Sequence, residues 1–146
     1  MRNKFDTHYV KKDDISRSWV LIDATEQTLG RLASEVAVLL RGKNKTNFQP
    51  SVDVGDYVIV INSSKIKVTG NKASGKIYNW YTGYPGGLKS RNFSSLQAEH
   101  PSRVFQLAVK RMLPKGRLGR QMIKKLNIYD GAEHNQSAQN PTLITI

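Results

Sequence analysis

The chain has 146 residues, no cysteine, and 23 basic against 11 acidic side chains, which gives a net charge of +12. A hydrophobic share of 38% is enough for the core of one compact domain, which argues against wholesale disorder. The lack of cysteine excludes disulfides and thiolate metal sites, and no apolar run approaches the roughly 18 residues needed to cross a bilayer. Since the first residues also lack the apolar core of a signal peptide, we expect a soluble, intracellular, basic protein.

The first third of the chain predicts a polar arm, a strand and a helix. Residues 1–18 are polar and aperiodic, which is typical of an extended arm. Trp19–Asp23 opens with four apolar residues and predicts a buried strand. After Thr28, the expected N-cap, apolar residues recur at spacings of three and four until Leu40, and Gly42 supplies the stop. This spacing predicts an amphipathic helix.

The middle of the chain predicts strands joined by loops. Tyr57–Ile61 is apolar and mostly β-branched, which makes it the strongest strand signal in the sequence. Ile66–Val68 is a shorter candidate, and Ile77–Tyr81 is an aromatic one. Gly83–Gly87 contains three glycines and a proline, so it must be a turn or loop.

The last third predicts two helices, a strand and a tail. Pro101 is suited to the first turn of a helix, a second helix is expected at residues 117–126, and Asn127–Tyr129 resembles a strand. Strands that alternate with helices predict the α/β fold class around a mostly parallel sheet. We divide the chain into an N-terminal extension, an α/β domain and a C-terminal tail, at residues 1–18, 19–130 and 131–146.

The positive charge is concentrated in the middle of the chain. Residues 41–125 carry 17 basic and three acidic side chains, whereas residues 1–40 are balanced and residues 126–146 carry only two acids. Such a field attracts polyanions. A charged run is often only a solvated surface, and a membrane is another polyanion, but no helix combines a basic face with exposed aromatic residues. Nucleic acid is therefore the better interpretation.

Two basic segments are more specific than the overall charge. In the helix expected at 117–126, Arg117, Arg120 and Lys124 fall within one sector while leucine and methionine occupy another, so the helix can dock on its apolar side and present cations outward. Residues 83–91 combine glycines with a tyrosine and two cations, a mixture that suits RNA because a ring can stack on a splayed base. The alternative for Tyr84, packing into the core, stays open here.

Signals for catalysis or metal binding are weak. Gly70–Lys76 matches the first seven positions of a phosphate-binding loop, but Ile77 replaces the Ser or Thr that holds magnesium, and a strand rather than a helix is expected to follow. The three histidines are isolated, and no serine lies in a nucleophile elbow. We therefore expect neither an enzyme nor a cofactor, metal ion or small-molecule substrate.

Several motifs in order resemble the bacterial-type family of large-subunit ribosomal protein thirteen (L13). The resemblance covers about residues 19 to 141, and the family often has glycine where this chain has Arg111. Its most specific part is Val109–Pro114 followed by Leu118–Arg120. The other motifs are Trp19–Ala24, Thr28–Ser34, Arg41–Lys43, Gly55–Asp56, Val58–Asn62, Thr69–Lys72 and Gly83–Leu88, and His134 and Ala138–Pro141 close the match.

The resemblance implies a three-layer α/β/α domain and an early-assembling structural protein of the large ribosomal subunit that binds ribosomal RNA. We expect neighbouring ribosomal proteins as partners, but neither membrane contact nor a homo-oligomer. The two termini should form extended arms. The expected location is a cytoplasmic bacterial ribosome, with an organellar ribosome as the alternative. Tyr84 is the candidate for base stacking. The candidates for phosphate contact are Lys43, Lys45, Lys72, Lys76, Lys89, Arg91, Lys110, Arg111, Lys115, Arg117, Arg120, Lys124 and Lys125.

Two other functions stay open. A sequence-specific DNA-binding regulator would need a recognition helix in the major groove, and the helix at 117–126 contains Gln121 but has no recognisable helix-turn-helix partner. A nucleotide-dependent enzyme would use Lys76 of the loop-like segment and hydrolyse ATP with magnesium.

Overall fold

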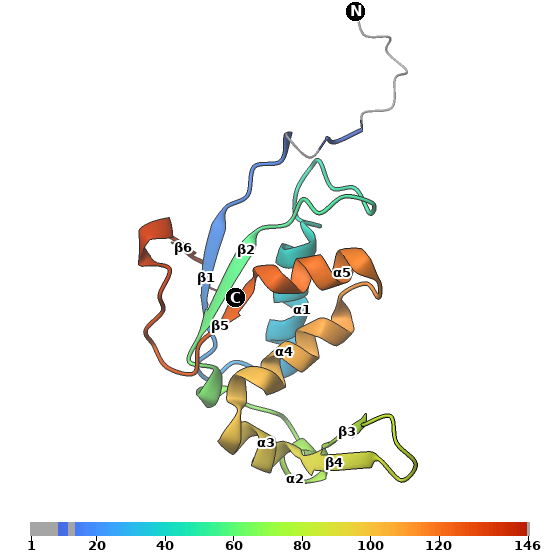
Figure 1. Ribbon diagram of the computed structural model, residues 1–146. Helices are drawn as coiled ribbons and strands as arrows, with labels where there is room; N and C mark the ends of the chain where they lie inside the picture. Colours follow the sequence, from blue (N-terminus) through green and yellow to red (C-terminus); the bar gives the residue numbers. More distant parts are fainter. Residues whose placement is uncertain (1–8, 12–13, 146) are drawn as a thin grey trace, which may run out of the picture.

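A four-stranded parallel sheet forms the centre of the protein. The computed structural model describes residues 9–11 and 14–145 of the chain (Figure 1). The strands lie in the spatial order β5-β2-β1-β6, and every neighbouring pair is parallel. Their bounds are β1 Trp19–Asp23, β2 Tyr57–Ile61, β5 Leu126–Ile128 and β6 Thr142–Leu143.

The core lies on one face of this sheet. Val20 pairs with Val58, and Ile22 pairs with Val60. Because strand residues two apart point to the same face, these four side chains form one apolar surface. None of the four is more than 4% exposed.

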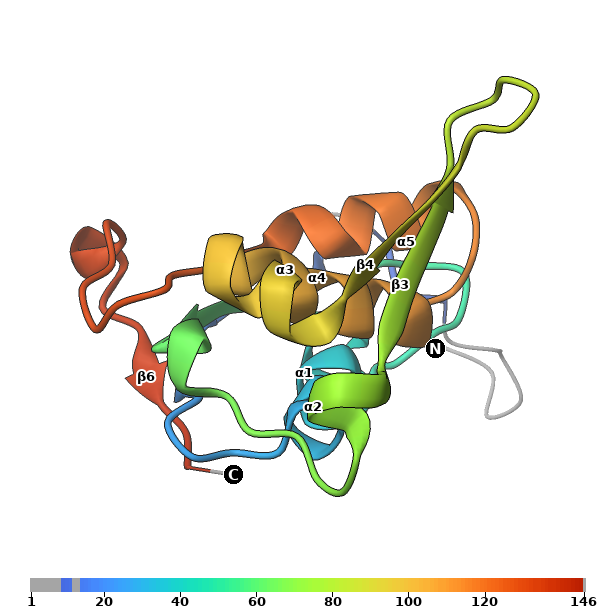
Figure 2. The same ribbon diagram turned by 90° about the horizontal axis from the view of Figure 1, so that it is seen from below.

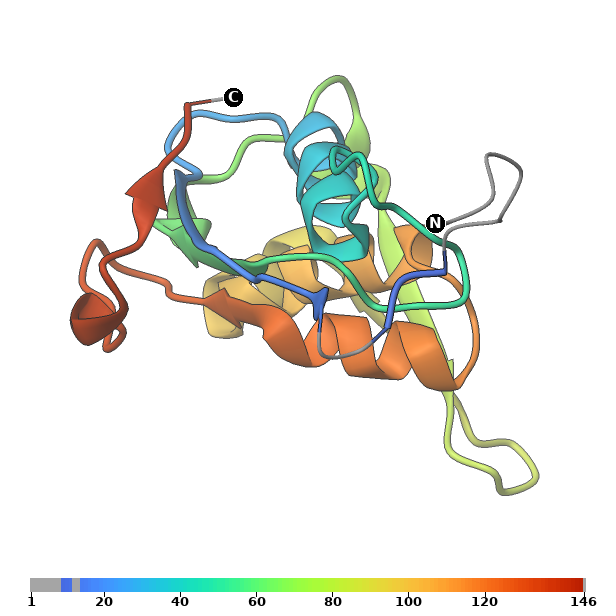
Figure 3. The ribbon, with the colours of Figure 1, turned by 90° about the horizontal axis from the view of Figure 1, so that it is seen from above.

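Two long helices pack on that face. They are α1 (Leu29–Arg41) and α4 (Pro101–Met112), and they lie in the connections from β1 to β2 and from β2 to β5. Both connections run in the same direction along the sheet, and because such crossovers are right-handed, both helices lie on the same side. Figure 3 shows α1 and α4 on one side of the strands and the segment leading to β6 on the other. The predicted α/β class with a mostly parallel sheet is confirmed.

The C-terminal segment returns to the sheet. After β5 the chain forms the short 3-10 helix η4 (Ser137–Gln139) and reaches the opposite edge of the sheet as β6. Thr142 pairs with Val20, and the N–H of Ile144 donates to the carbonyl of Leu21 at 2.9 Å. Part of the segment expected to be a tail is thus an edge strand, which is too short to show any periodicity in the sequence.

The N-terminal segment is attached to the loop before β2. Residues 1–8 and 12–13 of the predicted extension lie outside the described residues. Val10 is 2% exposed, and its N–H donates to Oε1 of Gln49 at 3.2 Å. The N–H of Ser18 donates to the Asp56 carboxylate at 2.8 Å. These contacts hold the entry to β1 against the chain that leads into β2.

A hairpin projects from the body between β2 and α4 (Figure 2). It consists of the antiparallel strands β3 (Ile77–Tyr81) and β4 (Leu88–Asn92), preceded by α2 (Lys72–Gly75) and followed by α3 (Phe93–Glu99). The strand predicted at Ile77–Tyr81 is confirmed. Strand β4 was not predicted, because its residues are all exposed and show no alternation of polar and apolar side chains.

Other predictions differ in detail from the structure. Ile66–Val68 is not a strand, because its only ladder contact is the single bridge between Thr28 and Lys67. Thr28 is the N-cap of α1, but its side chain makes no capping hydrogen bond. Gly42 ends α1 as predicted, with a left-handed φ of 78°. The helix expected at 117–126 divides into α5 (Arg117–Met122) and the 3-10 helix η3 (Ile123–Lys125).

Lys125 is buried, contrary to its prediction as a phosphate contact. Its ammonium donates to the Asp53 carboxylate at 2.6 Å and to the carbonyls of Gly55 and Leu40 at 2.8 and 2.9 Å. An ammonium has three donors, so none remains for a phosphate. Burial lowers the pKa of Lys125, and the hydrogen bond to Asp53 opposes that shift. The residue turns inward because the helix tightens at η3 and β5 begins at Leu126.

Replacing Lys125 by methionine should lower the free energy of unfolding by about 3–5 kcal/mol, because it leaves the Asp53 carboxylate unpaired in a largely buried site. The exposed neighbour provides a matched control, and Lys124→Met should change stability by less than about 0.5 kcal/mol. Urea unfolding midpoints of the three proteins measure the difference. Equal midpoints for the two variants would contradict a structural role of the pair.

Candidate nucleic-acid interface

The basic segments gather at one end of the molecule. In all three ribbon views, the loop after α1, the connection from α4 to α5 and the tip of the β3–β4 hairpin lie at the end opposite to β6 (Figures 1, 2 and 3). These segments belong to the part of the chain that carries 17 basic and three acidic residues, whereas β6 belongs to a part with only two acids. Residues that are basic in the sequence thus lie together at one end of the fold, and the acidic C-terminal residues lie at the other.

The basic charge is mostly uncompensated. Among the described residues, only four cations of residues 41–125 form ion pairs, namely Lys45 with Asp56, Lys67 with Glu26, Arg91 with Glu99, and Lys125 with Asp53. These pairs use every acid of residues 41–125. The remaining basic side chains have no ion pair among the described residues, so their positive charge is not compensated within the protein.

Helix α5 docks on its apolar side, as its sequence predicts. Met122 is 1% exposed and Leu118 is half-buried. Arg117, Arg120 and Lys124 are exposed, and none of them has an ion pair within the described residues. Preceding them, Lys110, Arg111 and Lys115 are exposed as well.

A glycine allows α5 to approach the chain before it. A Cβ added at Gly119 would lie 1.8 Å from the carbonyl oxygen of Pro114, which is far closer than any real contact. The side chain of Arg120 also turns back, and its Nε–H donates to the carbonyl of Gly116 at 3.3 Å. The close contact between α5 and Pro114 thus sets the direction in which the basic side of α5 faces.

The hairpin presents an exposed aromatic and basic tip. Tyr84 is 75% exposed, so the alternative of a ring packed in the core is wrong. The turn is closed by the Thr82 N–H donating to the Gly87 carbonyl at 3.0 Å. Lys89 and Arg91 on β4 are exposed, and Arg91 pairs with Glu99. Sequence reasoning did not single out Trp80, which is 40% exposed on β3.

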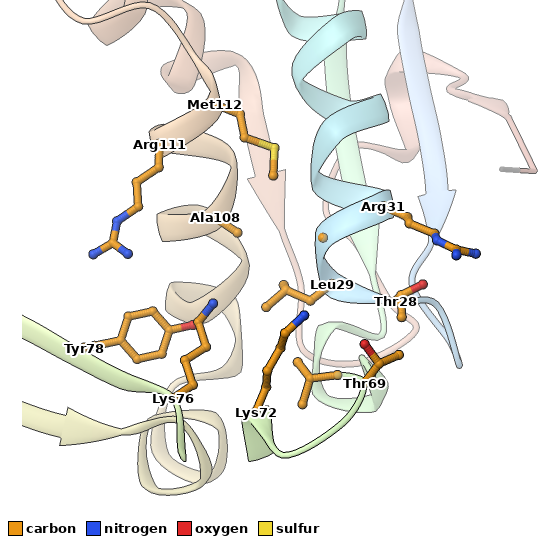
Figure 4. Close-up of a pocket in the computed structure, with 12 residues that line it drawn as sticks. Thr28, Leu29, Arg31, Thr69, Lys72, Lys76, Tyr78, Ala108, Arg111 and Met112 are labelled. Atoms are coloured by element: carbon orange, nitrogen blue, oxygen red, sulfur yellow. The ribbon is translucent and has the colours of Figure 1, made fainter. Parts of the chain in front are cut away.

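A cavity lies where α1, α2, β3 and α4 meet (Figure 4). Its volume is about 560 Å³. Three of the predicted phosphate contacts, Lys72, Lys76 and Arg111, line it together with Arg31, and no acidic residue does. The cavity therefore joins cations from three separate segments.

Tyr78 lies between two of these cations. Lys76 Nζ is 5.5 Å from the centre of its ring, and Arg111 Cζ is 5.9 Å from it. Both distances fall within the range of cation–π attraction. The strand Ile77–Tyr81 is predictable from its sequence, but nothing in its residue pattern indicates that Tyr78 is the one side chain that faces inward.

The remaining candidates lie in the loop after α1. Lys43 is exposed. Lys45 has a side chain that is only 21% exposed, and its ammonium donates to the Asp56 carboxylate at 2.6 Å and to the Ser16 carbonyl at 2.9 Å. Lys45 thus fastens the N-terminal segment, and its charge is largely used within the fold.

The segment that resembles a phosphate-binding loop lacks the architecture of one. Gly70–Lys76 contains only the four-residue helix α2 and leads into strand β3. The long helix whose N-terminus would bind the nucleotide phosphates is missing at this place. Among the described residues, no cluster of histidine, aspartate and glutamate could hold a metal ion. None of the described helices is long and apolar enough to span a membrane.

Fold and surface together define a small α/β protein with one strongly basic end. The chain belongs to the ribosomal protein L13 family, whose model matches residues 17–135. It is 58% identical to the large ribosomal subunit protein uL13 of Francisella philomiragia over 92% of this chain and 95% of that protein. It is 56% identical to uL13 of Dichelobacter nodosus, over 97% and 99% of the two chains. For Bacillus thuringiensis uL13 the identity is 56%, over 92% and 93%.

Membership of this family makes the chain a structural protein rather than an enzyme. The alternative of a nucleotide-dependent enzyme is thereby set aside, in agreement with the strand that follows Lys76.

The close contact of α5 predicts that Gly119→Ala lowers the free energy of unfolding by about 1–3 kcal/mol, because the added methyl group meets the Pro114 carbonyl. Gly75→Ala is the control, since Gly75 is also helical and a Cβ there meets no atom within 4 Å. Chemical denaturation of both variants measures the effect. A Gly119→Ala protein as stable as Gly75→Ala would show that α5 does not require this approach.

Proposed function

We propose that this protein is a structural constituent of the large ribosomal subunit and binds large-subunit ribosomal RNA with its basic end. The family of the chain and the names of its relatives, large ribosomal subunit proteins at 51–58% identity, support the ribosomal part of this proposal. The RNA-binding part is supported by the surface of the molecule itself.

The uncompensated basic end carries the proposal. Its exposed cations come from the loop after α1, from the hairpin and from the α4–α5 region, and the acids of residues 41–125 are already paired within the protein. Nucleic-acid phosphates would neutralise these cations and release condensed counterions, which favours binding. No comparable arrangement of cations occurs in residues 126–146, which contain no lysine or arginine.

The contacts would divide into two kinds. Lysine and arginine contacts to phosphates position a protein on RNA without reading its sequence. The hairpin adds Tyr84 and Trp80, whose exposed rings are free to stack on unpaired bases. Specificity would then come from the shape of the folded RNA, because that RNA would have to match both the hairpin and the α5 side at once.

The terminal segments would contact RNA or neighbouring ribosomal proteins. The protein would join the large subunit early in assembly, as a single copy. The ribosome would be a cytoplasmic bacterial one. A DNA-binding regulator has less support, because α5 has only six residues and offers little length for reading a major groove. Stronger binding to duplex DNA than to ribosomal RNA would favour it.

Sedimentation of a cell lysate tests the ribosomal assignment. The protein should co-sediment with the large subunit in a sucrose gradient and stay there after a high-salt wash, as detected by immunoblotting. A protein that remained in the light fractions at low salt would contradict the assignment.

The salt dependence of RNA binding tests the role of α5. Replacing Arg117, Arg120 and Lys124 by alanine should reduce the log–log slope of affinity against salt concentration by about 2–3 units, at roughly one phosphate per cation. Filter binding to a large-subunit ribosomal RNA transcript measures this slope. The control replaces Lys65 and Lys67 by alanine. Both are exposed, but Lys65 ends the 3-10 helix η2 (Ser63–Lys65) and Lys67 follows it, away from α5, so this change should leave the slope unchanged. An unchanged slope in the triple variant would show that α5 does not face the RNA.

A further inference from the structure

The cavity between α1 and α4 has the electrostatics of an anion site. Lys72, Lys76 and Arg111 line it, and none of the three has an ion-pair partner among the described residues. In Figure 4 the ammonium groups of Lys72 and Lys76 point into the space beside Leu29, whereas Arg31 points away from Tyr78. Like charges held close together without an acid are stabilised by an anion between them.

The first turn of α1 supplies a second source of positive potential. Thr28, Leu29, Gly30 and Arg31 all line the cavity. The N–H of Leu29 donates to the Lys67 carbonyl at 2.9 Å, and the amides of Gly30 and Arg31 have no acceptor within the helix. α1 has 13 residues, so its dipole favours an anion at this end.

An unpaired hydroxyl points into the same space. Tyr78 is 5% exposed, and its buried hydroxyl oxygen has no hydrogen-bond partner among the described residues. Figure 4 shows this hydroxyl directed from β3 toward the ammonium of Lys76 and the first turn of α1. Burial raises the pKa of Tyr78, and the charge of Arg111 opposes that shift. The hydroxyl therefore keeps its proton at neutral pH and can donate a hydrogen bond. A buried polar group without a partner is rare in folded proteins and requires an explanation.

We propose that this cavity binds one phosphate group, carried by an RNA strand. The hydroxyl of Tyr78 and the amides of Gly30 and Arg31 would donate to its oxygens, and Lys72, Lys76 and Arg111 would neutralise its charge. The cavity of about 560 Å³ is larger than a phosphate, and its apolar lining by Leu29, Val68, Ala108 and Met112 leaves room for the attached sugar. This inference rests on the proposed function, because it names the RNA group that the cavity would hold.

The local chemistry explains why a phosphate fits better than a carboxylate. A carboxylate also carries one negative charge on two oxygens, but it is planar, whereas the tetrahedral phosphate diester has oxygens that point out of any one plane. The donors here come from three separate segments, namely α1, α2 with β3, and α4, so they are not confined to one plane. Arginine and lysine at such sites bind phosphate with charge-assisted hydrogen bonds.

Amide chemical shifts in the presence of inorganic phosphate test the site directly. Adding phosphate to the full chain at constant ionic strength should shift the amide resonances of Gly30 and Arg31. The apparent affinity should fall about tenfold in Tyr78→Phe and in Lys76→Gln, since each loses one hydrogen bond to a charged group. Lys65→Gln, an exposed lysine outside the cavity, should behave like the parent. Dispersed spectra confirm that each variant is folded.

Binding to a large-subunit ribosomal RNA transcript identifies the source of the phosphate. A similar loss of RNA affinity in Tyr78→Phe and Lys76→Gln, with none in Lys65→Gln, would support the inference. If phosphate shifts the amides but RNA affinity is the same in all variants, the site takes a free phosphate compound and the RNA assignment is wrong.

The two proposals fail separately. If phosphate leaves the amides of Gly30 and Arg31 unchanged while the parent still binds the transcript, the cavity inference is overturned and the proposed function stands. If the parent does not bind the transcript at all, the proposed function fails as well.

Discussion

The handedness of the crossovers between parallel strands determines where the functional segments of this protein lie. Parallel neighbours cannot be joined by a tight turn, so β1, β2 and β5 require long connections. Because these connections are right-handed and run in one direction, α1 and α4 share a face of the sheet. The first turn of α1 then lies near the last turns of α4, and the cavity lined by Leu29 and Arg111 forms between them.

Internal ion pairs separate the charges that build the fold from those available to a partner. Asp53 and Asp56 lie just before β2. Asp53 binds Lys125, which also contacts the end of α1 and precedes β5. Asp56 binds Lys45, which also contacts the N-terminal segment. These acids are consequently not available to balance the outer cations. Self-repulsion among the outer cations should destabilise the free protein, and a bound polyanion would relieve it through linkage.

Apolar and glycine contacts decide where the outer charges point. The cations of α5 face outward because Met122 is buried beneath the helix and Gly119 allows it to approach Pro114. The hairpin works in a similar way, since the buried ring of Tyr78 fixes the base of β3 while Tyr84 extends from the far turn. These uncharged positions therefore control the direction of the outer charges without carrying any charge themselves.

Local patterns in the sequence were sufficient for several elements. The period of α1, the β-branched run of β2 and the apolar and basic sides of α5 depend on residues close in the chain, so spacing alone predicted them. The family was also recognisable from ordered motifs. Residues 66–68 show the limit of this reasoning, because a short apolar run forms a strand only if a neighbouring strand is free to pair with it, and here just one bridge forms.

The α/β class, the basic character of residues 41–125 and the amphipathic helices follow from composition and local periodicity, so they could be predicted from the sequence. Three features depend on the packed fold instead: Lys125 is internal, β6 forms an edge of the sheet, and Tyr78 lies between Lys76 and Arg111. The physical reason is distance along the chain. Lys125 meets Asp53 and Tyr78 meets Arg111 only after the crossovers have packed, and pairings between such distant residues leave no periodic signal in the sequence.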